Sequence, residues 1–161
     1  MASAQEIAQV LGLQEHREGG MFRELYRSVV RTHATKQRRA ATSIFYMLRA
    51  RDVSTWHLVK SDEIWMYHAG SSAVQLLLLP DGTFEERVIG PDVLSGEFPQ
   101  SLIPAWTWQS TVLTDRSEES WGLFGAVVCP GFEFEDYIEG RTEELVKRYP
   151  DAEGRIRELG L

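Results

Sequence analysis

The chain has 161 residues, of which 43% are hydrophobic and 25% charged, and this length and balance are typical of one globular domain, expected over residues 1–161. The net charge of −7 and the isoelectric point near 5.1 argue against a protein that binds nucleic acid or a membrane surface through a basic face. No apolar run approaches the ~18 residues that a membrane span needs, and the single cysteine, Cys129, allows no internal disulfide, so we expect a cytoplasmic protein.

The first predicted element is a short amphipathic helix from Ser3 to Leu11. Ser3 has the side chain of a helix cap, and Glu6 follows at the spacing of a capping box. Gly12 can end the helix, because glycine readily takes left-handed backbone angles.

From Phe22 to Ile138 the chain contains many short runs of β-branched and aromatic residues, separated by Gly, Pro, Asp and Ser. Short strands at such spacing indicate an all-β sandwich or barrel rather than alternating strands and helices. The letters "PDG" between "VQLLLL" and "TFEERVI" predict a tight hairpin. The expected strands are Phe22–Val30, Ala41–Leu48, Thr55–Val59, Glu63–Ala69, Val74–Leu79, Thr83–Ile89, Ser101–Pro104, Trp108–Leu113, Trp121–Val128 and Phe132–Ile138.

Two segments lie outside this strand pattern. The basic stretch from Arg31 to Arg39 is interpreted as a polar loop between strands rather than a phosphate-binding patch. The final segment, from Gly140 to Leu161, is helical again, with an interruption at Pro150.

The stretch "STWHLVKSDEIWMYHAG" holds two predicted strands joined by a turn. Because side chains alternate along a strand, His57 shares one face of the first strand with Val59, and Glu63 shares one face of the second with Tyr67. If both faces point into a barrel, His57 and Glu63 converge there. A histidine and a carboxylate placed together can bind a metal ion or act as a general acid and base.

The spacing in this stretch resembles the first motif of the cupin superfamily, which contains two histidines, a glutamate and a glycine. Those positions hold His57, Val59, Glu63 and Gly70 here. The second cupin motif resembles "IPAWTWQS", in which Gln109 stands where a further histidine would be. Two of the four residues that ligate metal in metal-binding cupins are therefore replaced.

A closer resemblance extends over nearly the whole chain. It is carried, in chain order, by the segments "HREGGMFRELYRS", "ATSIFYML", "WHLVKSDEIWMYHAG", "LIPAWTWQS" and "PGFEFEDYIEG". These segments resemble the small-cupin family called cupin family 5. The resemblance implies a double-stranded β-helix, also called a jelly-roll barrel, with the short helices added at both ends, and usually a homodimer, but no particular activity. The apolar run "VQLLLL" could supply an exposed edge strand for pairing between barrels.

The replacement of two metal-ligating histidines by Val59 and Gln109 affects the cofactor that we expect. A metal held by His57, Glu63 and Gln109 would have three protein ligands, one of them an amide oxygen, which transition metals bind weakly. We therefore expect no tightly bound cofactor, while a divalent metal could bind loosely or adventitiously at these three residues. Without a metal, Glu63 and Gln109 are expected to contact a ligand directly.

Aromatic side chains supply further candidates for the pocket. Tyr46 and Tyr67 are expected to reach it, where either phenol could return a proton that His57 removes. Trp108, the neighbour of Gln109, is expected to form a flat apolar wall against the ligand.

The segment "PGFEFEDYIEG" alternates aromatic and acidic residues. If it is a strand, Glu133 and Glu135 share one face. That face could meet solvent or the basic side chains of Arg23 and Arg27. Alternatively Glu135, or Glu133, could point into the barrel and bind the ligand.

Three functions remain open, all with a small-molecule ligand inside the barrel. The first is a metal-independent isomerase or epimerase, similar to the nucleotide-sugar epimerases among cupin barrels, which acts on a small polar, sugar- or keto-acid-like substrate with His57 as base and Tyr46 or Tyr67 as acid. The second is a non-catalytic ligand-binding or sensor barrel. The third is a metal-dependent oxygenase or lyase, which the missing histidines favour least. A shared fold does not decide among them.

Overall fold

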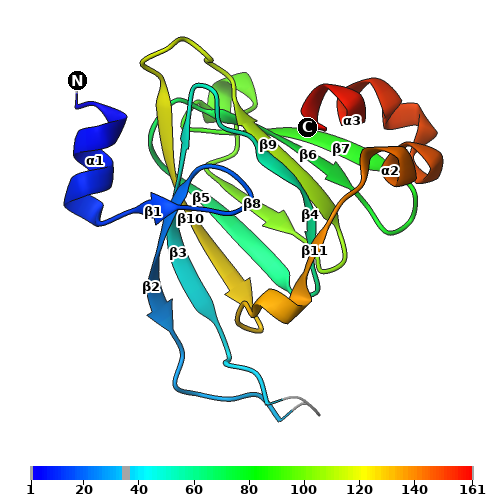
Figure 1. Ribbon diagram of the computed structural model, residues 1–161, viewed down its shortest axis with the longest axis horizontal. Coiled ribbons are helices and arrows are strands. Elements are labelled where there is room, and N and C mark those ends of the chain that lie inside the picture. The colour runs from blue at the N-terminus through cyan, green and yellow to red at the C-terminus, as the bar shows by residue number, and fades with distance from the viewer. Residues whose placement is uncertain (1, 34–36, 161) are drawn as a thin grey trace.

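The computed structural model describes residues 2–33 and 37–160. Two antiparallel sheets face each other across the interior, as Figure 1 shows. In spatial order, the first sheet contains β1 (Gln14–Glu15), β2 (Met21–Arg27), β3 (Thr42–Arg49), β10 (Trp121–Cys129), β5 (Asp62–Gly70) and β8 (Gln100–Ile103). The second contains β11 (Tyr137–Glu139), β4 (Ser54–Val59), β9 (Trp108–Leu113), β6 (Ala73–Leu78) and β7 (Phe84–Ile89). The predicted all-β jelly-roll barrel is confirmed.

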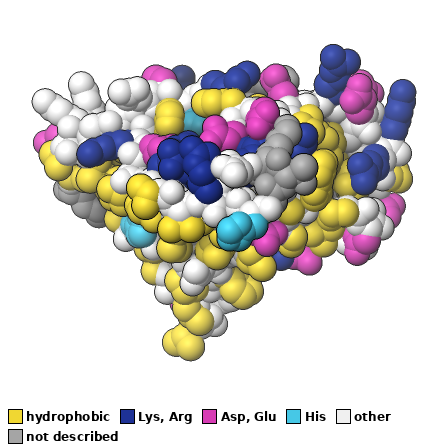
Figure 2. All heavy atoms as spheres, turned by 90° about the horizontal axis from the view of Figure 1, so that it is seen from below, with side chains coloured by type: hydrophobic (Ala, Val, Ile, Leu, Met, Phe, Trp, Pro, Cys, Tyr) yellow, Lys and Arg dark blue, Asp and Glu magenta, His cyan; other side chains and the backbone are white. Residues whose placement is uncertain are grey.

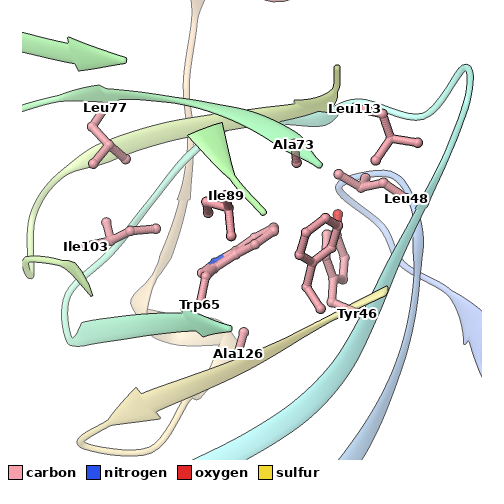
Figure 3. Packing of buried hydrophobic residues seen from close by; sticks show 10 residues of the cluster. Tyr46, Leu48, Trp65, Ala73, Leu77, Ile89, Ile103, Leu113 and Ala126 are labelled. Carbon is pink, nitrogen blue, oxygen red and sulfur yellow. The ribbon is translucent and has the colours of Figure 1, made fainter. Parts of the chain in front are cut away.

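The main core lies between the two sheets, where alternate side chains of each strand point inward. Tyr46 and Trp65 come from the first sheet, and their rings meet edge to face with centroids 5.3 Å apart. Figure 3 shows these two side chains at the centre of the core, with Ile89 of the second sheet beside Trp65. Burying this apolar surface is the main driving force for closing the barrel.

The helices cover the outer faces of the sheets. Helix α1 (Ala4–Leu11) has the predicted capping box at Ser3 and ends at Gly12 in left-handed geometry, as expected. Helices α2 (Thr142–Arg148) and α3 (Glu153–Leu159) pack on the second sheet, with a short 3₁₀ helix η3 (Pro150–Ala152) between them. The predicted interruption at Pro150 is therefore confirmed, because proline cannot continue the hydrogen-bonding pattern of α2.

Two strand predictions are wrong. The run "VQLLLL" is not an edge strand, because β6 pairs with β9 on one side and β7 on the other. The segment from Phe132 to Ile138 is not a continuous strand either. It forms a 3₁₀ helix, η2 (Phe134–Asp136), and only then the short strand β11. A third such helix, η1 (Val93–Ser95), lies between β7 and β8.

The basic stretch from Arg31 to Arg39 joins β2 to β3, and its two ends form an isolated bridge between Arg31 and Arg39. Residues 34–36 of this predicted loop lie outside the described residues. Within the described ranges, none of the helices has the length and hydrophobicity of a transmembrane helix.

Candidate functional site

A cavity of about 110 Å³ opens between β2, β4 and the segment that carries η2. A buried water needs roughly 10–15 Å³, so the cavity can hold a small organic molecule. Its apolar lining includes Phe22, Ile44, Val59, Val128, Phe132 and Phe134. Its polar lining is His16, Glu18, Glu24, Arg27, Thr42, His57, Glu63 and Glu133.

The turn between β1 and β2 places Glu18 in this cavity. Gly19 and Gly20 follow it with φ angles of 102° and 76°, a conformation that costs little only for glycine. A Cβ atom on Gly19 would lie 2.0 Å from the carbonyl oxygen of Val53. The hydroxyl of Tyr46 donates a hydrogen bond to the Gly19 carbonyl at 2.6 Å. The turn is therefore held tightly against the start of β4, and Glu18 is directed inward.

The Glu18 side chain is buried, with 9% of the residue exposed. The Ser54 hydroxyl donates to it at 3.4 Å, and no shorter side-chain hydrogen bond to it occurs among the described residues. Burial disfavours the charged carboxylate and raises the pKa of Glu18 to about 7. Glu18 is thus present both as acid and as base near neutral pH.

His57 lies beside Glu18, with its Nε2 atom 3.4 Å from Glu18 Oε2. Its Nδ1 atom is 2.7 Å from the carbonyl oxygen of Thr55. Because a carbonyl only accepts, Nδ1 carries the hydrogen, and Nε2 presents its lone pair to Glu18. Burial lowers the pKa of His57, although nearby Glu63 opposes this change. A neutral His57 and a protonated Glu18 can therefore share one proton.

His16 also lines the cavity, but it does not compete for the proton that Glu18 and His57 share. Its Nδ1 atom accepts a hydrogen bond from the backbone N–H of Glu18 at 3.2 Å, so this nitrogen cannot also donate to the carboxyl group. Burial lowers the pKa of His16 as well. The His16 ring packs edge to face on Phe22, with centroids 4.6 Å apart.

Glu63 faces the same cavity but has its own partners. Trp65 Nε1 donates to one oxygen at 2.9 Å, and Gln109 Nε2 donates to the other at 2.7 Å. Burial raises the pKa of Glu63, and these two donors work against the rise. Since Gln109 offers its amide N–H₂ group to Glu63, the pair is arranged as a hydrogen-bonded support rather than as two metal ligands.

The residues at the cupin metal positions therefore do not fit a metal ion. Val59 contributes no donor atom, and both oxygens of Glu63 are engaged by protein N–H groups. Across residues 2–33 and 37–160, no group of three or more His, Cys, Asp or Glu side chains is arranged to hold a metal.

Comparison with known proteins shows the family to which the chain belongs. Residues 5–138 match the family described as Cupin superfamily (DUF985). The chain belongs to this cupin family. An uncharacterised protein of Saccharomyces cerevisiae is 28% identical over 160 residues, which cover 91% of this chain and 79% of the yeast protein.

Two solved structures are similar to this cupin over its whole length. A protein from Shewanella oneidensis has a TM-score of 0.90 and 31% identity, and the match covers 100% of this chain and 99% of that one. A hypothetical protein from Leishmania major has a TM-score of 0.91 and 26% identity, with 99% of both chains covered. These similarities support the fold, and none of the three names states an activity.

The cupin brings only some of the predicted site residues to the cavity. His57 and Glu63 converge there, with Gln109 directly behind Glu63. Tyr46 does not line the cavity, because its hydroxyl is bonded to the Gly19 carbonyl, and burial raises its pKa well above the usual value. Tyr67 does not line it either, and its hydroxyl donates to the Gly70 carbonyl at 2.8 Å. The expectation that a phenol reaches the pocket is wrong for both.

Two further expectations about the cavity lining are also wrong. Trp108 packs on the opposite side of its sheet, in the cluster under α2 and α3. Glu135 pairs with Arg38 at 2.9 Å and has an exposed side chain. Glu133 lines the cavity instead, because the turn of η2 breaks the alternation that a strand would impose.

Sequence reasoning identified neither Glu18 nor His16 as a site residue, although both lie in a segment that carries the family resemblance. A signal for both was present in "HREGG". A histidine and a glutamate two residues apart, followed by two glycines, combine proton-exchanging side chains with a tight turn. Such a combination favours a functional loop over a plain connection.

Proposed function

We propose that this cupin is a metal-independent isomerase or epimerase, which removes a proton from a small polar substrate and returns it. Glu18 and His57 are the pair that carries the proton. One observation carries the proposal: a buried Glu18 carboxyl group, with a pKa raised to about 7, lies 3.4 Å from the unprotonated nitrogen of His57 at the wall of a cavity. Perturbed acids and bases in a cavity are typical of catalytic sites.

The proposed reaction uses one base. In the ionised pair, Glu18 takes a proton from a carbon next to a carbonyl group, and the electron pair of the broken C–H bond moves into an enolate. For isomerisation, the protonated pair gives the proton to the carbon of the former carbonyl, while the hydroxyl proton of the first carbon moves to the enolate oxygen, so that a new carbonyl forms at the first carbon. For epimerisation, the proton returns to the first carbon after the enolate has turned its other face to Glu18. A pKa near the working pH suits both halves, since the pair must be a base first and an acid second.

The proposal also specifies the ligand and the cofactor. The ligand is a small molecule inside the barrel. No metal takes part, because both oxygens of Glu63 accept hydrogen bonds from Trp65 and Gln109 and Val59 has no donor atom, which leaves His57 without enough partners for a metal site. A homodimer and a cytoplasmic location, both expected from the sequence, stay predictions that molar-mass measurement in solution and localisation of the tagged protein test.

Solvent exchange tests the proposal. The protein, treated with a chelator, is incubated in deuterated water with a panel of free keto- and aldo-sugars and keto-acids, and deuterium incorporation is followed by NMR. We expect exchange at a carbon next to the carbonyl of at least one compound. Glu18→Gln should abolish it, because an amide cannot take up the proton.

His68→Ala is the matched control, because His68 is exposed, away from the cavity. It should exchange at the wild-type rate. A compound that binds in the cavity without exchanging any proton would support the non-catalytic carrier instead. Exchange that disappears with the chelator would contradict the metal-free reaction.

A further inference from the structure

Arg27 is the one Lys or Arg side chain among the described residues that line the cavity, and its guanidinium group is already occupied. It donates to both oxygens of Glu24, each at 2.9 Å. It also donates to Glu133 at 2.8 Å and to the carbonyl oxygen of Phe132 at 3.2 Å. An anionic ligand would have to displace these acceptors in order to reach the positive charge.

The other ionisable groups of the cavity are carboxyl groups and histidines with lowered pKa values. Glu18, Glu24, Glu63 and Glu133 all contribute to the lining, against the single guanidinium group. Figure 2 shows acidic and basic side chains lying intermixed at the centre of the face seen from below, rather than a continuous basic patch. A carboxylate or phosphate entering this cavity would meet these like charges, and the one guanidinium group of the lining is already occupied. Arg17 is outside the lining, with its guanidinium group over the rings of Phe134 and Tyr137.

The available hydrogen-bonding atoms are mainly acceptors. His57 Nε2 carries a lone pair, and the ionised Glu18 carboxylate has lone pairs that one long bond from Ser54 leaves largely unused. The lining also holds two donors. The Thr42 hydroxyl accepts from the backbone N–H of Phe132 and keeps its own hydrogen, and His16 carries its ring hydrogen on Nε2 because Nδ1 accepts from Glu18. A ligand that brings hydroxyl or amino hydrogens matches such a wall.

We infer that the cavity takes a small molecule whose polar groups are hydrogen-bond donors and which carries no carboxylate or phosphate group. This inference rests on the proposed function for the position of the site, and it narrows the substrate class from sugar- or keto-acid-like compounds to uncharged polyhydroxyl compounds or their amino derivatives. Keto-acids and phosphate- or nucleotide-linked sugars are excluded. The ion pairs of Arg27 with Glu24 and Glu133 maintain the selectivity by keeping the guanidinium group from free anions.

Binding of matched probes tests the inference. Glucose, glucosamine and glucuronate share one ring and differ in charge, and inorganic phosphate serves as a second anion. Each is titrated into the full-length protein at neutral pH while the ring signals of His57, assigned by their absence in His57→Gln, are followed by NMR. We expect the signals to shift with glucose or glucosamine and to stay unchanged with glucuronate and phosphate at the same concentrations.

The titrations with glucose and glucosamine, in which we expect binding, show whether the ligand's donor groups are hydroxyl groups or a protonated amino group. A response to glucose indicates an uncharged polyol, and a response to glucosamine at a lower concentration indicates a protonated amino group. The inference is overturned if glucuronate or phosphate shifts the His57 signals at a concentration equal to or lower than the uncharged probe needs. It is equally overturned if neither glucose nor glucosamine shifts them.

A pair of variants tests the role of the Arg27 ion pairs. Glu24→Gln combined with Glu133→Gln removes the negative partners of Arg27 and should allow glucuronate to bind at least tenfold more tightly than to the wild type. Glu135→Gln is the matched control, because it changes the same residue type in the same segment, outside the cavity lining. This control variant should bind the four probes in the same order of affinity as the wild type. Unaltered glucuronate binding in a folded double variant would contradict the role of Arg27.

The outcome is separable from that of the proposed function. The proposed function is refuted if a ligand that binds shows no solvent exchange. This inference is refuted if anions bind, whether or not exchange occurs.

Discussion

Glu18 Oε2 lies 3.4 Å from His57 Nε2, although one residue comes from the turn before β2 and the other from β4 of the opposite sheet. The hydrogen bond from His57 Nδ1 to the Thr55 carbonyl orients the imidazole ring, and the two glycines after Glu18 hold the carboxyl group inside. The distance is at the long end of the range for a hydrogen bond, as is common in active sites before the substrate binds.

The first prediction concerns the pH dependence of solvent exchange. The pKa of Glu18 is raised to about 7, and the proposed base is the ionised carboxylate. The rate of proton removal should therefore rise as the pH increases through about 7 and level off above it. Exchange rates measured from acidic to mildly alkaline pH check this. A rate that falls over the same interval would show that the protonated pair starts the reaction.

The second prediction concerns stability. The pKa of Glu18 is near 4.5 in the unfolded chain and about 7 in the folded protein, so between these values the folded state binds the extra proton. Stability therefore falls as the pH rises across this interval, by about 3 kcal/mol at most for this group. Glu18→Gln has no such proton, and its unfolding free energy should depend less on pH. Urea denaturation of both proteins at the two ends of the interval measures the difference.

The barrel could be predicted from the sequence, because the sequence signals for strands are local. Alternation, turn residues and the capping box at Ser3 act over a few positions, and the spacing of the cupin motifs added the topology. It was insufficient for the segment after β10. Phe132 to Ile138 alternates as a strand does, but the 3₁₀ turn of η2 has three residues per turn, and this puts Glu133 rather than Glu135 on the cavity side.

The candidate site was only partly predictable for a related reason. His57 and Glu63 flank one turn, so their convergence follows from strand alternation alone. Glu18 reaches them only because the turn at Gly19 is closed against Val53, a contact between segments far apart in the chain. Tyr46 does point inward as alternation predicts, but the pattern of a strand cannot say which polar atom its hydroxyl meets.

The third prediction separates a positioning role of Tyr46 from a catalytic one. Tyr46→Phe removes the donor to the buried Gly19 carbonyl and should destabilise the protein by about 1–3 kcal/mol. It should lower the exchange rate only in part, because the aromatic ring still fills the core and Glu18 keeps the proton. Denaturation and exchange measured on the same preparation check both effects. Complete loss of exchange in a folded Tyr46→Phe protein would mean that the phenol itself transfers a proton.

The fourth prediction uses two glycines with similar backbone angles and different surroundings. Gly19 and Gly82 have φ angles of 102° and 94°, so alanine is strained at both. At Gly82 an added Cβ meets nothing within 4 Å, whereas at Gly19 it would lie 2.0 Å from the Val53 carbonyl oxygen. Gly82→Ala should therefore cost about 1–2 kcal/mol, the usual penalty for left-handed backbone.

Gly19→Ala should cost clearly more than Gly82→Ala, because the turn must also move away from β4. That movement takes Glu18 away from His57, so exchange should be lost in Gly19→Ala under conditions where the protein is still folded, and retained in Gly82→Ala. Denaturation curves and exchange rates of the two variants provide the comparison. Equal stability and equal exchange in both would mean that closing this turn against Val53 does not position the site.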